Sequence, residues 1–141
     1  MFQTLAYYVT VFRRSFTSYT NQQLQKLGLN FGSLFLVIYV GKHPGCTQAE
    51  LTKALRLDWG YSQRSVTKLV DAGFLTREKA GRAYHLNLSV KGQEAFSVSH
   101  QVFFDWDRQA LSALDEGEQK QLFDLLEKIK RKEANPTCTK L

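Results

Sequence analysis

The chain has 141 residues, the length of one domain, and its hydrophobic and charged fractions of 43% and 23% are ordinary for a globular protein. Its longest apolar run, residues 34–40, is too short to span a bilayer, and the chain opens without a signal peptide pattern. We therefore expect a cytoplasmic protein that does not enter the membrane. Cys46 and Cys138 lie far apart without CxxC spacing, which favours neither a disulfide framework nor a zinc finger.

Positive charge is concentrated in the first part of the chain. The net charge is +6, but the first 92 residues hold 12 Lys/Arg against 4 Asp/Glu, whereas the remainder holds 7 against 9. Such a local surplus indicates an anionic partner for the first part. Surplus lysines can also serve solubility alone, so motifs must decide between the two.

Two helices are expected at the start. Residues 3–26 repeat apolar side chains at helical spacing and contain no acidic residue, which predicts a long amphipathic helix. Asn30 is a suitable N-cap for the next segment, residues 31–42, which is apolar nearly all round and ends before Pro44 and Gly45. This pattern is typical of a buried central helix.

The next two helices have the spacing of a helix-turn-helix motif. Thr47 and Glu50 form a capping box before a short helix, and Asp58 caps a second one that Gly73 ends. At 100° per residue, one face of the second helix holds Trp59, Ser62, Val66, Leu69 and Val70, and the opposite face holds Tyr61, Arg64, Ser65 and Lys68. The first face is expected to pack and the second to face outward.

A hairpin and two further helices follow. Residues 74–79 and 83–88 are short β-prone runs around a basic turn at 80–82, which predicts a wing. Ser89 can cap a long helix, and Asp115 with Glu118 can cap the last one. Asn135 and Pro136 are expected to end it.

The fold class predicted from these elements is all-α with a small β-hairpin wing, a winged helix-turn-helix. We expect one unit over residues 1–141, with a DNA-binding lobe at 30–90 and a helical dimerisation region at 1–29 and 91–141. The first helix and the last two carry more apolar surface than one small wing domain can cover, so a second copy is expected to cover it. A closed bundle within one chain is the alternative.

The outward face of the second motif helix suits the major groove of double-stranded DNA. Arg64 can bridge guanine O6 and N7, and Gln63 can pair with adenine. Lys68 or Thr67 can reach a phosphate or a base edge, and Tyr61 can meet the DNA backbone or a thymine methyl group. The alternative is a solvated helix face without a partner.

The hairpin and the preceding helix add further candidates for DNA contact. Arg82 at the hairpin tip suits a narrow minor groove, and Arg77 and Lys79 lie on the incoming strand. Thr47 and Gln48, at the start of the preceding helix, can hold a phosphate. A wing directly after a basic reading helix favours DNA binding over solubility.

These stretches resemble the MarR family, the multiple antibiotic resistance type of bacterial regulator. The resemblance covers nearly the whole chain and is carried by HPGCTQAEL at 43–51, LDWGYSQRSVTKLVDAGFLTR at 57–77 and LSVKGQEAF at 88–96. It implies a triangular all-α homodimer with small wings, in which the first helix and the last two interlock. The function implied is that of a ligand-responsive repressor at a pseudo-palindromic operator.

The chain departs from the family pattern at the reading helix and the wing. The family variant opens this helix with Asp-x-Gly-Tyr-Leu-Ser-Arg, which is matched by Asp58, Gly60, Tyr61 and Arg64. Ser62 replaces the leucine and Gln63 the serine, so the seating of the helix and the base preference are expected to differ. Ala80 stands where an aspartate would orient the wing arginine, so Arg82 is expected to be more mobile.

Small ligands or oxidants often tune regulators of this family, which makes an effector a further expected partner. Aromatic side chains that can line a pocket between the lobes are Tyr8, Phe12, Phe16, Tyr39 and Trp59. A stripe of aromatics can equally be plain core.

Other chemistry has little support in the sequence. His43 and Cys46 make at most half a zinc site, and Cys46 as an oxidant sensor stays open. His85 and His100 have no evident nucleophile partner, so we expect neither an enzyme nor a cofactor. The rival interpretations are a winged-helix module that pairs with another protein without reading DNA, and an enzyme or carrier that uses the cavity between the lobes.

Overall fold

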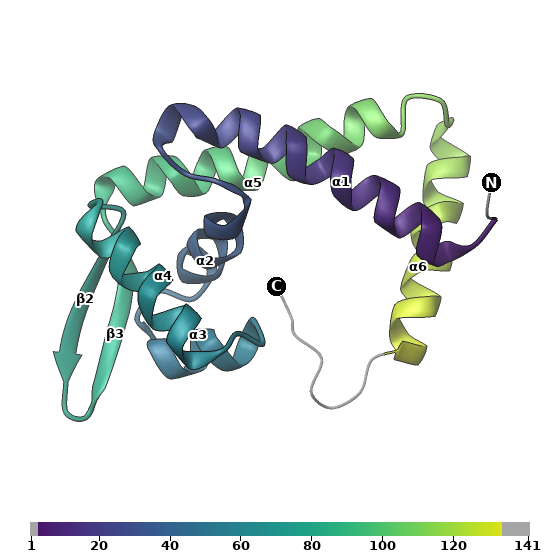
Figure 1. Ribbon diagram of the computed structural model, residues 1–141. Helices are drawn as coiled ribbons and strands as arrows, with labels where there is room; N and C mark the ends of the chain where they lie inside the picture. The colour runs from purple at the N-terminus through teal and green to yellow at the C-terminus, as the bar shows by residue number, and fades with distance from the viewer. Residues whose placement is uncertain (1–2, 134–141) are drawn as a thin grey trace.

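The computed structural model describes residues 3–133 and confirms the predicted fold class (Figure 1). Helix α1 (Leu5–Leu24) continues into a short 3-10 helix, η1 (Gln25–Leu27), and α2 spans Phe31–Lys42. Helices α3 (Gln48–Ala54) and α4 (Trp59–Asp71) follow, then strands β2 (Leu75–Ala80) and β3 (Ala83–Leu88). Helices α5 (Val90–Ala110) and α6 (Glu116–Glu133) close the described part of the chain.

Side-chain oxygens cap the helices at the predicted positions. Each accepts a hydrogen bond from the backbone N–H three residues ahead: Asn30 for α2, Thr47 for α3, Asp58 for α4 and Ser89 for α5. At α6 the box is reciprocal, because Asp115 N donates to Glu118 Oε1 at 3.1 Å and Glu118 N donates to Asp115 Oδ1 at 2.8 Å. The predicted helix end at Asn135 and Pro136 lies outside the described residues.

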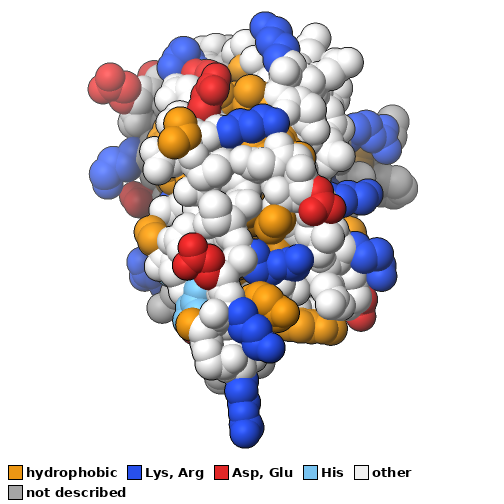
Figure 2. All heavy atoms as spheres, turned by 90° about the vertical axis from the view of Figure 1, so that its left-hand side faces the viewer, with side chains coloured by type: hydrophobic (Ala, Val, Ile, Leu, Met, Phe, Trp, Pro, Cys, Tyr) orange, Lys and Arg blue, Asp and Glu red, His pale blue; other side chains and the backbone are white. Residues whose placement is uncertain are grey.

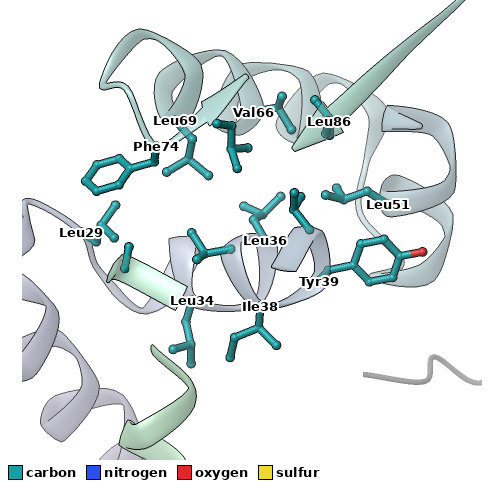
Figure 3. Close-up of a cluster of buried hydrophobic side chains, with 14 of the residues drawn as sticks. Leu29, Leu34, Leu36, Ile38, Tyr39, Leu51, Val66, Leu69, Phe74 and Leu86 are labelled. Carbon is teal, nitrogen blue, oxygen red and sulfur yellow. The ribbon is translucent and has the colours of Figure 1, made fainter. Parts of the chain in front are cut away.

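The core is built around α2. Other elements of the fold cover this helix, which explains why its sequence is apolar nearly all round. Helices α1 and α5 pack against it, and so do α3, α4 and β3. The side chains that converge on it include Leu51, Val66, Leu69, Phe74 and Leu86, all 5% exposed or less (Figure 3). The expectation of a buried central helix is confirmed, and this helix fixes α3, α4 and the hairpin relative to one another.

The hairpin, which we call the wing (residues 75–88), belongs to a sheet of three strands. Strands β2 and β3 pair up to Ala80 and Ala83, and Gly81 takes the left-handed conformation that the two-residue turn requires, with φ +65°. A two-residue strand, β1 (Cys46–Thr47), pairs with β3 on the other side, with Cys46 opposite Leu86. This strand was not predicted, and it ties the start of α3 to the base of the wing.

One predicted core position is wrong. Trp59 was expected on the packed face of α4, but its side chain is 51% exposed. It is the first residue of the helix and lies beyond the edge of the packed face. Ser62 and Val66, further along the same face, are fully buried.

Helices α1 and α5 lie side by side, and α6 turns away from them at the end opposite the wing (Figure 1). No single helix within residues 3–133 is long and apolar enough to cross a membrane. Among the same residues, one pair of helices, Leu5–Leu27 and Phe31–Lys42, reaches that length and composition together, but it is bent by 73°.

Candidate nucleic-acid interface

Helix α4 presents a polar face to solvent and is firmly seated on the other side. Gln63, Arg64 and Lys68 are exposed, whereas Val66 and Leu69 are 0% and 5% exposed. Because the buried face is fixed by the core, the exposed side chains are held in a defined array along the helix. An array of one amide, one guanidinium and one ammonium group matches what base edges and phosphates accept.

A chain of buried hydroxyl groups joins α4 to α3. Ser62 Oγ lies 2.6 Å from Thr52 Oγ1, and Thr52 Oγ1 donates to the carbonyl oxygen of Gln48 at 2.7 Å. The threonine has one hydroxyl proton and gives it to Gln48, so Ser62 is the donor to Thr52. At the position where the family pattern has leucine, this chain therefore has a serine, Ser62, that is held by a hydrogen bond.

Arg64 lies over the first turn of α4. A Cβ atom added to Gly60 would be 3.1 Å from Arg64 Nη1 and 3.2 Å from Asp58 Oδ2. The absence of a side chain at Gly60 therefore gives the guanidinium room beside the N-cap carboxylate. The match of Asp58, Gly60 and Arg64 to the family pattern has a physical reason, because the three residues share one small space.

Tyr61 is half exposed, and its hydroxyl group lies at the start of α2. It is 3.3 Å from the position of a Cβ atom on Gly32, next to the N-cap Asn30. The phenol thus bridges α4 and α2. The side chain keeps 43% of its surface exposed, so part of it is open to a DNA backbone.

The wing carries the other predicted cations. Lys79 and Arg82 are exposed, and Figure 2 shows Lys and Arg side chains continuing down to the protruding end of the molecule. Arg77 is partly buried and its Nη1 donates to Thr67 Oγ1 at 3.1 Å. Two residues predicted to contact DNA therefore bind each other across α4 and β2, a contact that the sequence did not indicate.

The start of α3 offers less than predicted. Thr47 is half-buried, and its Oγ1 accepts from Glu50 N at 3.0 Å. Gln48 is only 5% exposed, so the structure does not place its side chain on the surface.

The predicted effector aromatics do not form one group. Tyr8 stacks on Phe12 at 6.2 Å between ring centres, and both Phe12 and Phe16 pack edge-on against Trp106 of α5. Tyr39 instead is buried and stacks on His43, with 4.2 Å between the two ring centres. Trp59 lies exposed at the start of α4. Trp106 of α5 lies at the centre of the first group.

A hollow of about 530 Å³ runs along one side of α1, and sequence reasoning did not find it. Its lining residues are Thr10, Arg13, Arg14, Thr17, Ser18 and Asn21. Arg13 also lies over the ring of Phe31, with 5.4 Å from the guanidinium carbon to the ring centre. The hollow is positively charged, since Arg13 and Arg14 line it and α1 has no acidic residue.

Metal and thiol chemistry find little support in the described part of the chain. Within residues 3–133, no group of three or more His, Cys, Asp or Glu side chains is placed to hold a metal ion. Burial, with the nearby Glu50 carboxylate, raises the pKa of the Cys46 thiol to about 11, which disfavours the reactive thiolate. Cys138 lies outside the described residues.

The helix-turn-helix formed by α3 and α4, the basic outward face of α4 and the basic hairpin beside it define a winged helix-turn-helix protein of the DNA-binding class. Comparisons with known proteins give its family. The sequence model of the MarR family matches residues 27–83. The HTH-type transcriptional regulator BilQ of Clostridium symbiosum (strain WAL-14163) is 50% identical over 139 residues, which cover 96% of each chain. The chain therefore belongs to the MarR family of transcriptional regulators.

Solved structures show the same fold. A crystal structure of MarR matches with a TM-score of 0.84 and 22% identity, covering 94% of both chains. A MarR family regulator from Listeria monocytogenes, solved in complex with 26mer DNA, matches with a TM-score of 0.79 and 21% identity, covering 93% of this chain and 89% of the other.

Proposed function

We propose that the protein is a ligand-responsive repressor that binds a pseudo-palindromic operator as a homodimer. Helix α4 enters the major groove and the wing reaches the adjacent minor groove. The observation that carries the proposal is the exposed array of Gln63, Arg64 and Lys68 on a helix whose other face is fully packed. The DNA complex of the Listeria relative supports it, because that protein shares the fold.

We propose separate roles for the two parts of the chain and for the candidate contact residues. Residues 30–90 form the DNA-binding lobe, and residues 1–29 with 91–141 form the dimerisation region. Gln63 and Arg64 read base edges, and Lys68, Lys79, Thr47 and Tyr61 contact the backbone. Arg82 enters the minor groove. In a two-fold dimer each lobe takes one half of the operator.

The first prediction separates base reading from wing binding. An operator is obtained by selecting tight binders from random duplexes, and affinity is then measured on it and on single-base variants at several salt concentrations. Arg64→Ala should cost about 1–3 kcal/mol per half-site and relax preference at one symmetric pair of positions, since it removes a bidentate contact. Arg82→Ala should weaken binding to all DNA sequences more evenly. It should also reduce the slope of log affinity against log salt by about 0.9 for each phosphate contact that is lost.

Lys26→Ala is the matched control, because Lys26 is exposed in η1, away from α4 and the wing, and removes one charge. It should leave sequence preference unchanged. If Arg64→Ala keeps both affinity and preference, α4 is not the reader. A winged-helix module that pairs with another protein would then be the better interpretation.

We propose the hollow on α1 as the place of a small effector. Its two guanidinium groups, from Arg13 and Arg14, favour an aromatic molecule that carries a negative charge. Benzoate should bind to the protein, as measured by titration calorimetry, and weaken operator binding more than phenol of similar size does. Arg14→Ala should abolish this difference. If neither benzoate nor phenol binds the protein or changes its affinity for the operator, this hollow is not the effector site.

A further inference from the structure

Arg77 makes two contacts that connect the wing to α4. Its Nη1 donates to Thr67 Oγ1 at 3.1 Å, from β2 to the middle of α4. Its guanidinium carbon lies 5.5 Å from the centre of the Tyr84 ring on β3. One side chain therefore touches both strands of the hairpin and the helix beside it.

The register of the hairpin explains why these side chains meet. Lys79 pairs directly with Tyr84, and Arg77, two residues earlier, projects from the same face of β2. Lys79 Nζ lies 5.9 Å from the centre of the Tyr84 ring, so both cations use the same platform. They differ in what else they do, because Lys79 is exposed whereas Arg77 is partly buried and bonded to Thr67.

Beyond Glu78 and His85 the wing is a hairpin of two strands, which is marginally stable in water by itself. The angle of this outer part therefore depends on what holds the base, which is β1 beside β3 and the Arg77–Thr67 contact beside β2. The tip lacks the family aspartate, since Ala80 stands in its place, and Arg82 has no carboxylate there to orient it. A contact three residues before Ala80 that fixes the strand to α4 limits how far the tip can swing. It sets the distance between the wing arginine and the side chains of α4.

We propose that Arg77 is a positioning residue: with Thr67 it holds the wing at a fixed place against α4 and does not itself neutralise a phosphate. This inference rests on the proposed DNA binding. It changes the role of two residues that the sequence assigned to DNA contact. It also makes Thr67, although it lies on α4, part of a brace for the minor-groove arm.

A double-mutant cycle with Arg82→Ala tests the proposal on the selected operator. Arg77→Gln should weaken binding of the wild-type wing, but it should add nothing to affinity loss or salt slope once Arg82 is gone. A phosphate ligand would instead lower the salt slope by about 0.9 in both backgrounds. Lys79→Gln is the matched control on the same strand and the same ring, and its effect should add to that of Arg82→Ala.

Thr67→Val repeats the test without a change of charge. If Thr67 acts through Arg77, this variant should weaken wild-type binding and have no effect in the Arg77→Gln background. Additive losses from Thr67→Val and Arg77→Gln, with a lower salt slope for the latter, would overturn the brace. The comparison stays informative even if Arg77→Gln lowers stability, because Thr67→Val keeps the guanidinium.

Hydrogen exchange of the free protein supplies a readout that does not need DNA. Arg77→Gln and Thr67→Val should both speed exchange of the β2 and β3 amides while leaving those of the buried face of α4 unchanged. A second outcome is faster exchange in both variants while the wild-type protein binds no duplex. That result would refute the proposed function, and the Arg77–Thr67 contact would remain a structural brace. Unchanged exchange in both variants would refute the brace itself.

Discussion

Ser62 stands where the family pattern has leucine, and its hydroxyl group needs a hydrogen-bond acceptor, which Thr52 provides. Its hydroxyl group is fully buried and donates to Thr52, which in turn donates to Gln48 O. Buried hydroxyl groups need such partners, because an unpaired one costs about 1–3 kcal/mol. Ser62 and Thr52 therefore work as a pair, and we expect that the family leucine cannot replace Ser62 in this chain without loss of stability.

We predict that Ser62→Leu, which restores the family residue, destabilises the protein by about 1–3 kcal/mol, because the site is closed and already packed. Thr52→Val should cost about the same, since it leaves the Ser62 donor without an acceptor. Urea unfolding measures both, with the exposed Ser97→Ala as control, expected within about 0.5 kcal/mol of wild type. A Ser62→Leu protein as stable as wild type would show that the pair is dispensable.

Caps and turns could be predicted at this scale, whereas contacts across elements could not. The signals at Asn30, Asp58, Ser89 and Gly73 are local, because each depends on neighbours within a few residues. The bond from Arg77 to Thr67 depends on how β2 lies against α4, which helical and strand periodicity do not specify. The exposure of Trp59 has the same origin, since periodicity gives a face but not where the packed area stops.

At the scale of elements, the end of α4 is fastened to the start of α5. Ser89 N donates to Phe74 O at 3.0 Å, and Lys91 Nζ donates to Ala72 O at 2.8 Å while lying over the Phe74 ring. A Cβ atom on Gly92 would overlap the backbone oxygen of Phe74, so glycine is what allows this approach. Because α5 also packs along α1, α4 is rigidly connected to the proposed dimerisation region.

Gly92→Ala should therefore separate the two elements. We expect a loss of about 1–3 kcal/mol in the free energy of unfolding from overpacking, together with weaker operator binding because α4 shifts relative to α5. Gly117→Ala is the control, since it lies exposed in the first turn of α6 and its Cβ would meet only the Asp115 side chain. Differential scanning calorimetry and a binding titration on both variants test this. Equal behaviour of the two alanine variants would mean that the junction adapts freely.

The long elements were predictable because periodicity and caps agree along each of them. Strand β1 was not, since two residues carry no alternation that can be recognised. It exists because Cys46 and Thr47 pass beside the free edge of β3, a consequence of the route of the chain after α2. The short wing was placed correctly because Gly81 marks its turn.

For the whole molecule, the distribution of exposed apolar side chains points to a second copy. Leu5, Val9 and Phe12 on α1 and Phe104 on α5 are each more than half exposed. On α6, which stands apart from the lobe in Figure 1, the exposed apolar residues are Phe123, Leu125, Leu126 and Ile129. An amphipathic helix gains its stability by covering such a face, and this chain alone does not cover it.

The last prediction tests that second copy and its consequence for DNA. Leu126→Asp with Ile129→Asp should convert a dimer into a folded 16.2 kDa monomer in sedimentation at micromolar concentration. Burying each of these side chains contributes about 1.5–3 kcal/mol, and a two-fold interface holds each of them twice, so the loss exceeds what a dimer of ordinary affinity tolerates. Gln121→Asp adds one charge of the same sign at an exposed polar position of α6 and should remain dimeric.

The loss of the dimer should also weaken operator binding by this variant. A monomer has one lobe and contacts one half-site, so it lacks the second lobe that is tethered to the first in a dimer. The far-ultraviolet circular dichroism should stay mainly helical, since α2 and the lobe around it are packed within one chain. A wild-type protein that sediments only as the monomer, or a double variant that still binds the full operator with wild-type affinity, would contradict the two-fold arrangement. Reading of DNA by α4 would then have to be explained by a single lobe.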